Sequence, residues 1–183
     1  MIFYHFTSLG HLPLILASGA LNKSGIMLGE HGHQSLNAPW LTLNPDPARE
    51  YGLGFGQMVK LPPDVSKELG KGWTESVDKR TARITVKVPS TDRRLKHWIK
   101  WIQGRLGQEM LDWYIETGGG KAQAENWYVF LGPIPRSEFM RIEVRGERNE
   151  WIEATNEIIA CIRPHTTGAT FGVEPYPLED IDL

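Results

Sequence analysis

The stretch IFYHFTSLGHLPLILASG, residues 2–19, contains the strongest fold signal of the chain. Five of its first six residues are aromatic or β-branched, which is typical of a strand in a half-buried sheet, and Ser8-Leu9-Gly10 ends that pattern. Apolar residues then recur at helical spacing from Leu12 to Leu16. Pro13 is tolerated only in a first helical turn, and Gly19 is well placed to end a helix. We therefore predict a strand followed directly by a short helix.

The rest of the chain mixes strands and helices in an irregular order. Extended patterns are found at residues 38–43, 83–89, 126–131 and 139–144. Residues 83–89 alternate apolar with polar side chains, which predicts a strand with one solvated face. Helical patterns are found at residues 95–106, 110–115 and 151–162. Because no regular β-α-β alternation is present, we expect an α+β architecture rather than a doubly wound parallel sheet.

Length and composition indicate one ordinary globular domain. The chain has 183 residues, of which 40% are hydrophobic and 23% charged, and its net charge of -2 gives no global reason to bind nucleic acid or an anionic membrane. We expect a single domain over residues 1–165 and an acidic, proline-containing tail over residues 166–183. The single cysteine, Cys161, excludes a disulfide framework and a multi-cysteine zinc site, and we expect it in a helix core.

The beginning of the sequence does not match a targeting segment. Residues 1–22 contain no Lys, Arg, Asp or Glu, and polar residues interrupt the apolar run. This composition fits neither a secretory signal nor a membrane span, so we expect a cytoplasmic protein with no membrane partner.

Common catalytic and metal-binding motifs are weak in this chain. His31 and His33 lie two residues apart, but no third ligand stands at a defined spacing, so we expect no metal site. No nucleophile-elbow pattern is present, and the glycines at Gly52 and Gly54 lack the full pattern of a phosphate-binding loop.

Three separated blocks are informative when they are read together. The first is Tyr4-His5-Phe6-Thr7, followed by Leu12-Pro13-Leu14-Ile15-Leu16 and Gly19. The second is Trp40-Leu41-Thr42, and the third is Gln123-Ala124-Glu125 leading into a strand. In order and setting these blocks resemble the ADP-ribosyltransferase superfamily. The first block and the layout of residues 124–144 are similar to those of the DNA-modifying ADP-ribosyltransferase toxins.

The resemblance implies a fold, a co-substrate and a set of site residues. The fold would be a split β-sandwich with flanking helices, and NAD would bind in a cleft between the first two strands and the strand that begins near Glu125. The residues implied for catalysis are His5, Thr42 and Glu125. Those implied for NAD binding are His5, Phe6 through its backbone, Thr7, Trp40 and Tyr51, and Gln123 would help to choose the acceptor.

The chemistry of NAD cleavage explains the value of a fixed carboxylate. Breaking the nicotinamide bond develops an oxocarbenium-like cation on the ribose, and a carboxylate held nearby is most useful as that charge develops. Glu125 has this setting because it lies between a flexible glycine-rich loop, residues 118–123, and a rigid strand.

Structural roles for the same residues stay open at this level. His5 fits a histidine at the edge of the core, Thr42 fits a strand that favours β-branched residues, and Glu125 fits a solvated strand start. Gln123 fits a plain loop, and the aromatic residues Trp40 and Tyr51 fit a core.

The resemblance leaves the acceptor open. The DNA-modifying relatives place an arginine before their second strand, whereas residues 25–39 contain none, which argues against DNA. The expected partners are NAD and a macromolecular acceptor, either protein or nucleic acid, and a toxin would also have an inhibitory or antitoxin partner. The alternatives on the same fold are RNA 2′-phosphotransferase activity and NAD glycohydrolase activity.

A non-catalytic function is the remaining alternative. Basic residues surround Trp98 and Trp101 within residues 93–105, and cations next to aromatic rings can contact phosphates and stack on bases. An amphipathic helix with one solvated face explains the same pattern.

Overall fold

The computed structural model describes residues 1–22, 38–46, 58–60, 70, 73–75, 79–103, 105, 107–117 and 120–162. The predictions for Tyr51, for the His31 and His33 pair and for the tail at 166–183 fall outside these residues.

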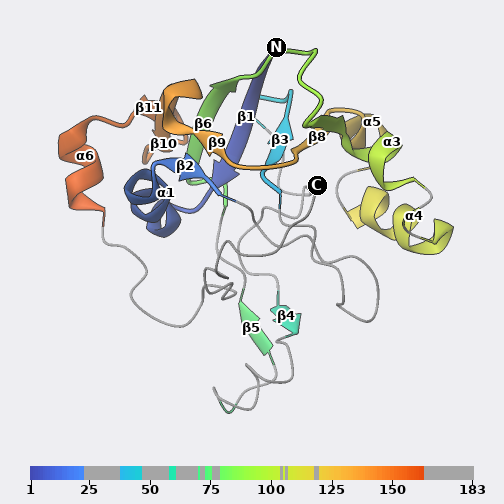
Figure 1. Ribbon diagram of the computed structural model, residues 1–183. Coiled ribbons are helices and arrows are strands. Elements are labelled where there is room, and N and C mark those ends of the chain that lie inside the picture. The colour runs from blue at the N-terminus through green and yellow to red at the C-terminus, as the bar shows by residue number, and fades with distance from the viewer. Residues whose placement is uncertain are drawn as a thin grey trace.

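Strands and short helices alternate irregularly along the described chain (Figure 1). The strands are β1 (Ile2–Thr7), β2 (Ala20–Leu21), β3 (Trp40–Thr42), β4 (Met58–Lys60), β5 (Trp73–Glu75), β6 (Ala82–Lys87), β7 (Leu95–His97), β8 (Trp127–Phe130), β9 (Ile134–Pro135), β10 (Phe139–Arg145) and β11 (Trp151–Glu153). The α-helices are α1 (Leu12–Ser18), α3 (Trp98–Ile102), α4 (Gln108–Thr117), α5 (Lys121–Ala124) and α6 (Asn156–Cys161). The short 3-10 helices are η1 (Leu9–His11) and η2 (Arg136–Glu138).

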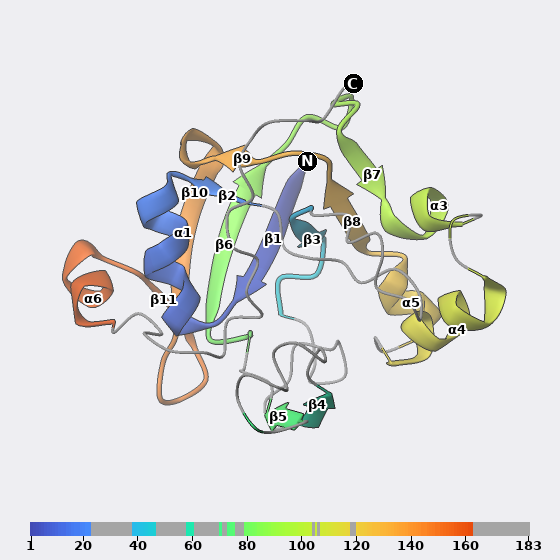
Figure 2. The ribbon, with the colours of Figure 1, turned by 60° about the horizontal axis from the view of Figure 1, so that its bottom comes forward.

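A seven-stranded sheet in the order β11-β10-β6-β1-β3-β8-β7 forms the centre of the molecule (Figure 2). The strand pairs of this sheet are antiparallel. Two-stranded sheets are formed by β2 with β9 and by β4 with β5. The α+β prediction is therefore confirmed in its general form, a mixed architecture with a mostly antiparallel sheet.

The register of β1 defines two faces of the sheet. Because side chains alternate along a strand and directly paired residues share a face, Tyr4 and Phe6 lie on one face and Phe3, His5 and Thr7 on the other. Tyr4 pairs with Thr42 of β3, and Phe6 pairs with Arg83 of β6. We call the side of His5 the α1 face and the side of Tyr4 the second face.

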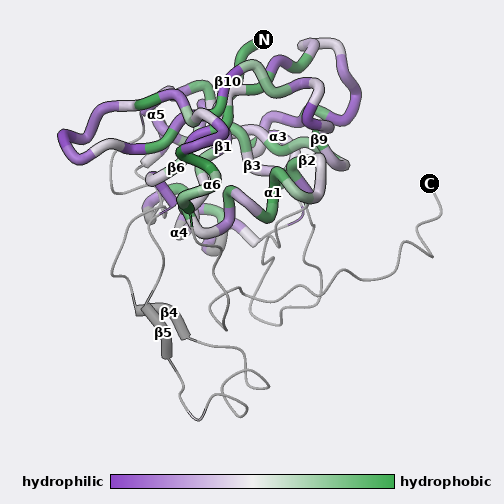
Figure 3. The backbone as a smooth tube through the Cα atoms, turned by 90° about the vertical axis from the view of Figure 1, so that its left-hand side faces the viewer, coloured by the Kyte–Doolittle hydropathy of each residue, from purple (hydrophilic) through white to green (hydrophobic). Residues whose placement is uncertain are grey.

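The α1 face contains the larger hydrophobic cluster. Phe3, Ile84 and Val86 of the sheet pack with Leu12 of α1 and Ile134 of β9, and Ile158 of α6 lies against the cluster. Figure 3 shows hydrophobic residues of α1 in green next to the sheet. This packing explains α1, since a helix of seven residues is marginal without a surface to bury its apolar side.

A second cluster lies on the other face, over β3 and β8. Trp98 and Ile102 of α3 pack against Trp127 and Val129 of β8, with Leu111 of α4. The rings of Trp98 and Trp127 meet edge to face at 5.3 Å between centroids, a favoured aromatic geometry. The two clusters fix helices to opposite faces of one sheet.

The first strand and helix follow the sequence prediction closely. β1 spans Ile2–Thr7 and α1 spans Leu12–Ser18, with a proline in its first turn. Gly19 ends the helix in the left-handed conformation, with a φ of 71°, which glycine adopts without a steric penalty. Among the helices that the structure describes, none is both long enough and apolar enough to span a bilayer.

The helical prediction for residues 95–106 is wrong at its beginning. Leu95–His97 is strand β7, which pairs with β8 at the edge of the sheet, and helix α3 contains only Trp98–Ile102. Leu95, Trp98 and Ile102 have helical spacing, but Leu95 packs in the first cluster and the other two pack in the second. The helical spacing therefore led us to assign to one helix residues that pack in two different clusters.

Other local predictions also need correction. Trp151–Glu153 is strand β11 rather than the start of the last helix, and α6 begins at Asn156 after Thr155, whose side chain accepts a hydrogen bond from the N–H of Ile158. Cys161 is exposed rather than in a helix core. Lys121–Ala124, predicted as part of a flexible loop, forms helix α5.

The prediction of a solvated face for β6 is wrong for most of the strand and holds only at its last residue, Lys87, which is exposed. Arg83 and Thr85, two of the three polar residues of the alternating pattern, are both buried. The guanidinium of Arg83 pairs with the carboxylate of Glu143 at 2.8 Å, so the polar side of the strand faces an internal ion pair.

Candidate active site

The strands associated with His5, Thr42 and Glu125 are consecutive neighbours in the central sheet. His5 lies in β1, Thr42 ends the adjacent β3, and Glu125 stands two residues before the beginning of β8, which pairs with β3. Segments separated by more than 100 residues of sequence therefore meet within three strands.

His5 has a defined tautomer. Its Nδ1 lies 2.9 Å from the carbonyl oxygen of Trp40, and because a carbonyl only accepts, Nδ1 must carry the proton and donate. Burial lowers the pKa of His5 below the ordinary value of 6.5; the bond to the Trp40 carbonyl opposes this shift and the charge of Lys79 adds to it. A neutral ring with the proton on Nδ1 leaves Nε2 as a hydrogen-bond acceptor.

Thr42 does not share a face with His5. It pairs with Tyr4 and therefore lies on the second face, where it is buried with 8% of its surface exposed. Its hydroxyl oxygen accepts a hydrogen bond from the backbone N–H of Asn44 at 3.1 Å. The described contacts of Thr42 therefore stabilise the turn after β3, and the register does not bring Thr42 and His5 to one side of the sheet.

Glu125 is exposed and held through its backbone. It follows the last residue of α5 in a helical conformation, and its N–H donates to the carbonyl of Lys121 at 3.1 Å. The next residue, Asn126, is anchored on both sides: its N–H donates to the carbonyl of Gln123, and its carbonyl accepts from the N–H of Leu43, the residue directly after β3. The carboxylate thus projects from a fixed stretch of chain between a helix and a strand.

Gln123 lies in α5, two residues before Glu125, and is half-buried. Residues two apart on a helix do not face each other, so the described geometry does not direct both side chains to the same point.

The remaining NAD-binding predictions fall on β1 and β3. Trp40 lies against Trp98 and Trp127 in the second cluster. Phe6 is buried near Trp151 on the second face, and Thr7 is buried on the α1 face. Among the described residues, β3 pairs with β1 only at Tyr4 and Thr42, so this ladder ends before Phe6.

His97 and Tyr128 were missed by the sequence analysis. They pair across β7 and β8 on the α1 face, and their rings meet edge to face at 5.1 Å. Nε2 of His97 lies 3.0 Å from the carbonyl oxygen of Glu125. The helical prediction for residues 95–106 hid this pair, because a helix would not place His97 next to β8.

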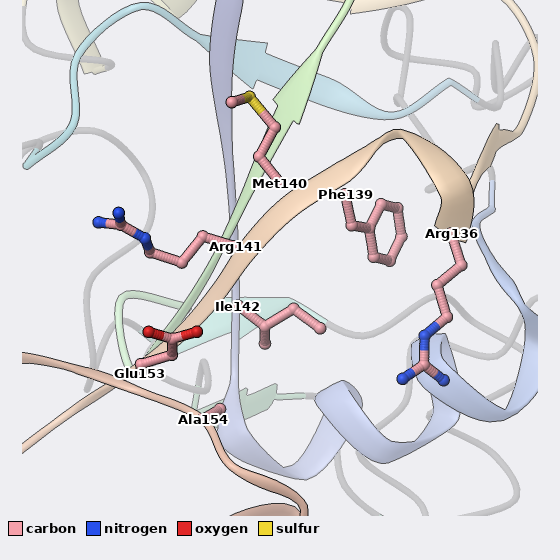
Figure 4. Close-up of a pocket in the computed structure, with 7 residues that line it drawn as sticks. All are labelled: Arg136, Phe139, Met140, Arg141, Ile142, Glu153 and Ala154. Atoms are coloured by element: carbon pink, nitrogen blue, oxygen red, sulfur yellow. The ribbon is translucent and has the colours of Figure 1, made fainter.

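A shallow pocket of about 250 Å³ lies near the opposite edge of the sheet, on β10 and β11 (Figure 4). Its lining includes Arg136 and Arg141, whose guanidinium groups lie on opposite sides of the view, with Glu153 below Arg141 and beside Ile142. None of the predicted site residues lines it, and its two cations do not converge on one point.

Among the described residues, no group of three or more His, Cys, Asp and Glu side chains could hold a metal ion. Comparison with family models, with curated proteins and with solved structures finds no match to this chain.

Proposed function

We propose that this protein is an NAD-dependent mono-ADP-ribosyltransferase that transfers ADP-ribose to a macromolecular acceptor and releases nicotinamide. The observation that supports the proposal best is the adjacency of β1, β3 and β8, the strands that the sequence blocks identify. In the proposed fold, a split β-sandwich, these strands form the floor of the NAD cleft. A cytoplasmic location belongs to the same proposal.

In the proposed reaction the bond between C1′ of the ribose and the nicotinamide nitrogen breaks, and its electron pair leaves with nicotinamide. The acceptor forms a new bond to C1′ and gives up a proton. The exposed carboxylate of Glu125 stabilises the cation that develops on the ribose between these two events.

His5 is assigned to holding NAD rather than to the chemical step. Its Nε2 is an acceptor at neutral pH, and a ribose hydroxyl can donate to it. Because the β1–β3 ladder ends before Phe6, the Phe6 backbone is not paired with β3 in the described part of the chain. This favours the proposed contact between the Phe6 backbone and the nicotinamide amide, which needs one donor and one acceptor.

Two further assignments are refined by the described contacts, and two are kept. Thr42 is proposed to support the segment next to Glu125 through the turn at Asn44, rather than to contact the ribose. Trp40 is proposed to act through its carbonyl, which orients His5, because its ring packs in the cluster on the second face. Gln123 remains the proposed acceptor contact, and Thr7 the continuation of the NAD-binding strand.

The alternative function, a nucleic-acid-binding module built on residues 93–105, has less support. Trp98 is 1% exposed and cannot stack on a base without unfolding its cluster. Arg94 pairs with Asp92, and Arg105 lies over Trp101 with a hydrogen bond to its carbonyl. Two of the cations of this segment thus have partners within the protein, and one of its two tryptophans is buried.

The experiment that tests the proposal incubates the purified protein with fractionated cell extract and NAD labelled either in the adenylate phosphate or in the nicotinamide ring. We expect the nicotinamide label to stay small and soluble and the adenylate label to enter a protein or nucleic-acid fraction. Adenylate label found only in free ADP-ribose would identify a glycohydrolase, and uncleaved NAD in every fraction would refute the proposal. If the acceptor fraction is found, a cell extract that suppresses the transfer would be the source of an inhibitory or antitoxin partner.

A further inference from the structure

The backbone of Glu125 is held from a distant part of the sequence. His97 stands 28 residues earlier, at the end of β7, and its Nε2 is 3.0 Å from the Glu125 carbonyl oxygen. Since that oxygen only accepts, Nε2 carries the proton and donates. The N–H of Glu125 is already bound to Lys121, so both main-chain groups of Glu125 have partners.

The ring of His97 also packs against Tyr128, while its second nitrogen is unsatisfied among the described residues. It pairs with Tyr128 across the strand ladder and meets the tyrosine ring edge to face. Its Nδ1 is buried and has no hydrogen-bond partner among the described residues. A buried polar atom without a partner lowers stability, and such atoms are rare enough to call for a functional explanation.

A histidine is not needed here for packing alone. The contact with Tyr128 requires only an aromatic ring, and a phenylalanine would supply it without an unpaired nitrogen. What histidine adds is the Nε2 donor aimed at the residue whose side chain is the candidate catalytic carboxylate.

We propose that His97 is a positioning residue that fixes the backbone of Glu125 at the junction of α5 and β8 and thereby aims its carboxylate. The catalytic part of this inference, that His97 aims the carboxylate at the reacting ribose, rests on the proposed function. Without the His97 donor, the Glu125 carbonyl loses this partner, and among the described contacts the peptide after Glu125 is held only through the bond from the Asn126 N–H to Gln123. A carboxylate displaced by about 1 Å loses much of its effect on a transition state.

Two matched variants separate the donor from the ring. His97→Phe keeps an aromatic contact with Tyr128 and removes the donor, whereas His97→Gln loses the ring but places an amide N–H near the position of Nε2. We expect nicotinamide release to fall about tenfold or more in His97→Phe through kcat, with little change in the KM for NAD, and to recover in large part in His97→Gln.

A double variant tests whether His97 acts through Glu125. Once Glu125→Gln has removed the carboxylate, adding His97→Phe is expected to cause no further loss of kcat, because the two residues act as one unit. The proposal would be overturned if the losses of kcat multiplied in the double variant, or if His97→Phe and His97→Gln lost kcat equally. Either result would assign His97 to fold stability.

Hydrogen exchange supplies a readout that does not depend on turnover. The Asn126 amide is expected to exchange faster in His97→Phe than in wild type, with exchange in β1 and β6 unchanged. Unchanged exchange at Asn126 would refute the positioning role even in an active enzyme. If the wild type cleaves no NAD, the proposed function fails and the catalytic meaning of His97 fails with it, while faster exchange would still show that His97 fixes this backbone.

Discussion

His5 illustrates how a hydrogen-bond partner and burial together set the protonation of a single side chain. The Trp40 carbonyl fixes the proton on Nδ1, and burial lowers the pKa of the ring, so Nε2 is an acceptor at neutral pH. A histidine that only packs at the edge of the core would also need one backbone partner, so NAD affinity is the measurement that separates the two roles.

Replacing His5 tests its role in holding NAD. His5→Phe keeps a ring and removes both nitrogens, and the loss of one hydrogen bond to a ribose hydroxyl is expected to weaken NAD binding several-fold, up to about tenfold. Isothermal titration calorimetry measures the affinity. Tyr4→Phe is the matched control, because Tyr4 is the preceding residue of the same strand and points to the second face. An NAD affinity that is unchanged in His5→Phe would assign His5 to packing.

The lowered pKa of His5 also predicts a pH dependence of stability. Below about pH 6.5, His5 binds a proton in the unfolded chain but not yet in the folded protein. Burying a neutral His5 therefore costs no stability above about pH 6.5, and the free energy of unfolding falls as the pH drops below this value. Denaturant unfolding of wild type and His5→Phe, measured between about pH 7.5 and about pH 5.5, compares the two slopes. We expect a smaller loss of stability in the variant, and parallel losses would show that His5 does not titrate differently in the folded state.

At the scale of the elements, local signals were sufficient for β1 and α1 and also located β3, β6, β8, β10 and α4, but they were insufficient for β7, β11 and α5. Pro13 and Gly19 fix the ends of α1 within a few residues of sequence, and these signals do not depend on the rest of the fold. His97 is in a strand because β8 lies beside it, and no residue near it in sequence indicates that pairing.

Register is the second limit of prediction at this scale. His5 and Thr42 both lie on strands as predicted, but a shift of one residue decides whether two side chains share a face. The pairing of Tyr4 with Thr42 puts them on opposite faces, and sequence patterns alone do not determine it.

The ion pair between β6 and β10 gives a prediction about stability. Arg83 and Glu143 have side chains that are 10% and 7% exposed, so Glu143→Gln would leave the Arg83 charge buried without its partner. We expect a loss of about 3 kcal/mol in the free energy of unfolding, and a smaller loss in the double variant Arg83→Met, Glu143→Leu, which buries no charge. Chemical denaturation measures both.

The exposed pair of Arg94 and Asp92 is the control for that experiment. Arg94 has a side chain that is 56% exposed, and Asp92→Asn is expected to change the free energy of unfolding by less than about 1 kcal/mol. A loss in Glu143→Gln no larger than in Asp92→Asn would show that the β6–β10 pair is solvated after all.

At the scale of the whole molecule, the central sheet brings together distant segments of the sequence. β1 is flanked by β6 and β3, and β8 joins the sheet next to β3 although it follows β3 by more than 80 residues. Composition and periodicity predicted the mixed architecture, whereas the order of the strands is a property of the complete fold. The sequence blocks at His5, Thr42 and Glu125 anticipated one part of that order, the β1–β3–β8 neighbourhood.

Nicotinamide release by Glu125→Gln, compared with wild type and with Glu116→Gln, tests the central claim most directly. Glu116 is an exposed glutamate of α4, so its replacement removes the same charge without touching the site. We predict a loss of about 10²-fold or more in Glu125→Gln with an unchanged affinity for NAD, as expected when a single electrostatic stabiliser of the transition state is removed, and near wild-type release in Glu116→Gln. Near wild-type release by a folded Glu125→Gln variant would contradict the account.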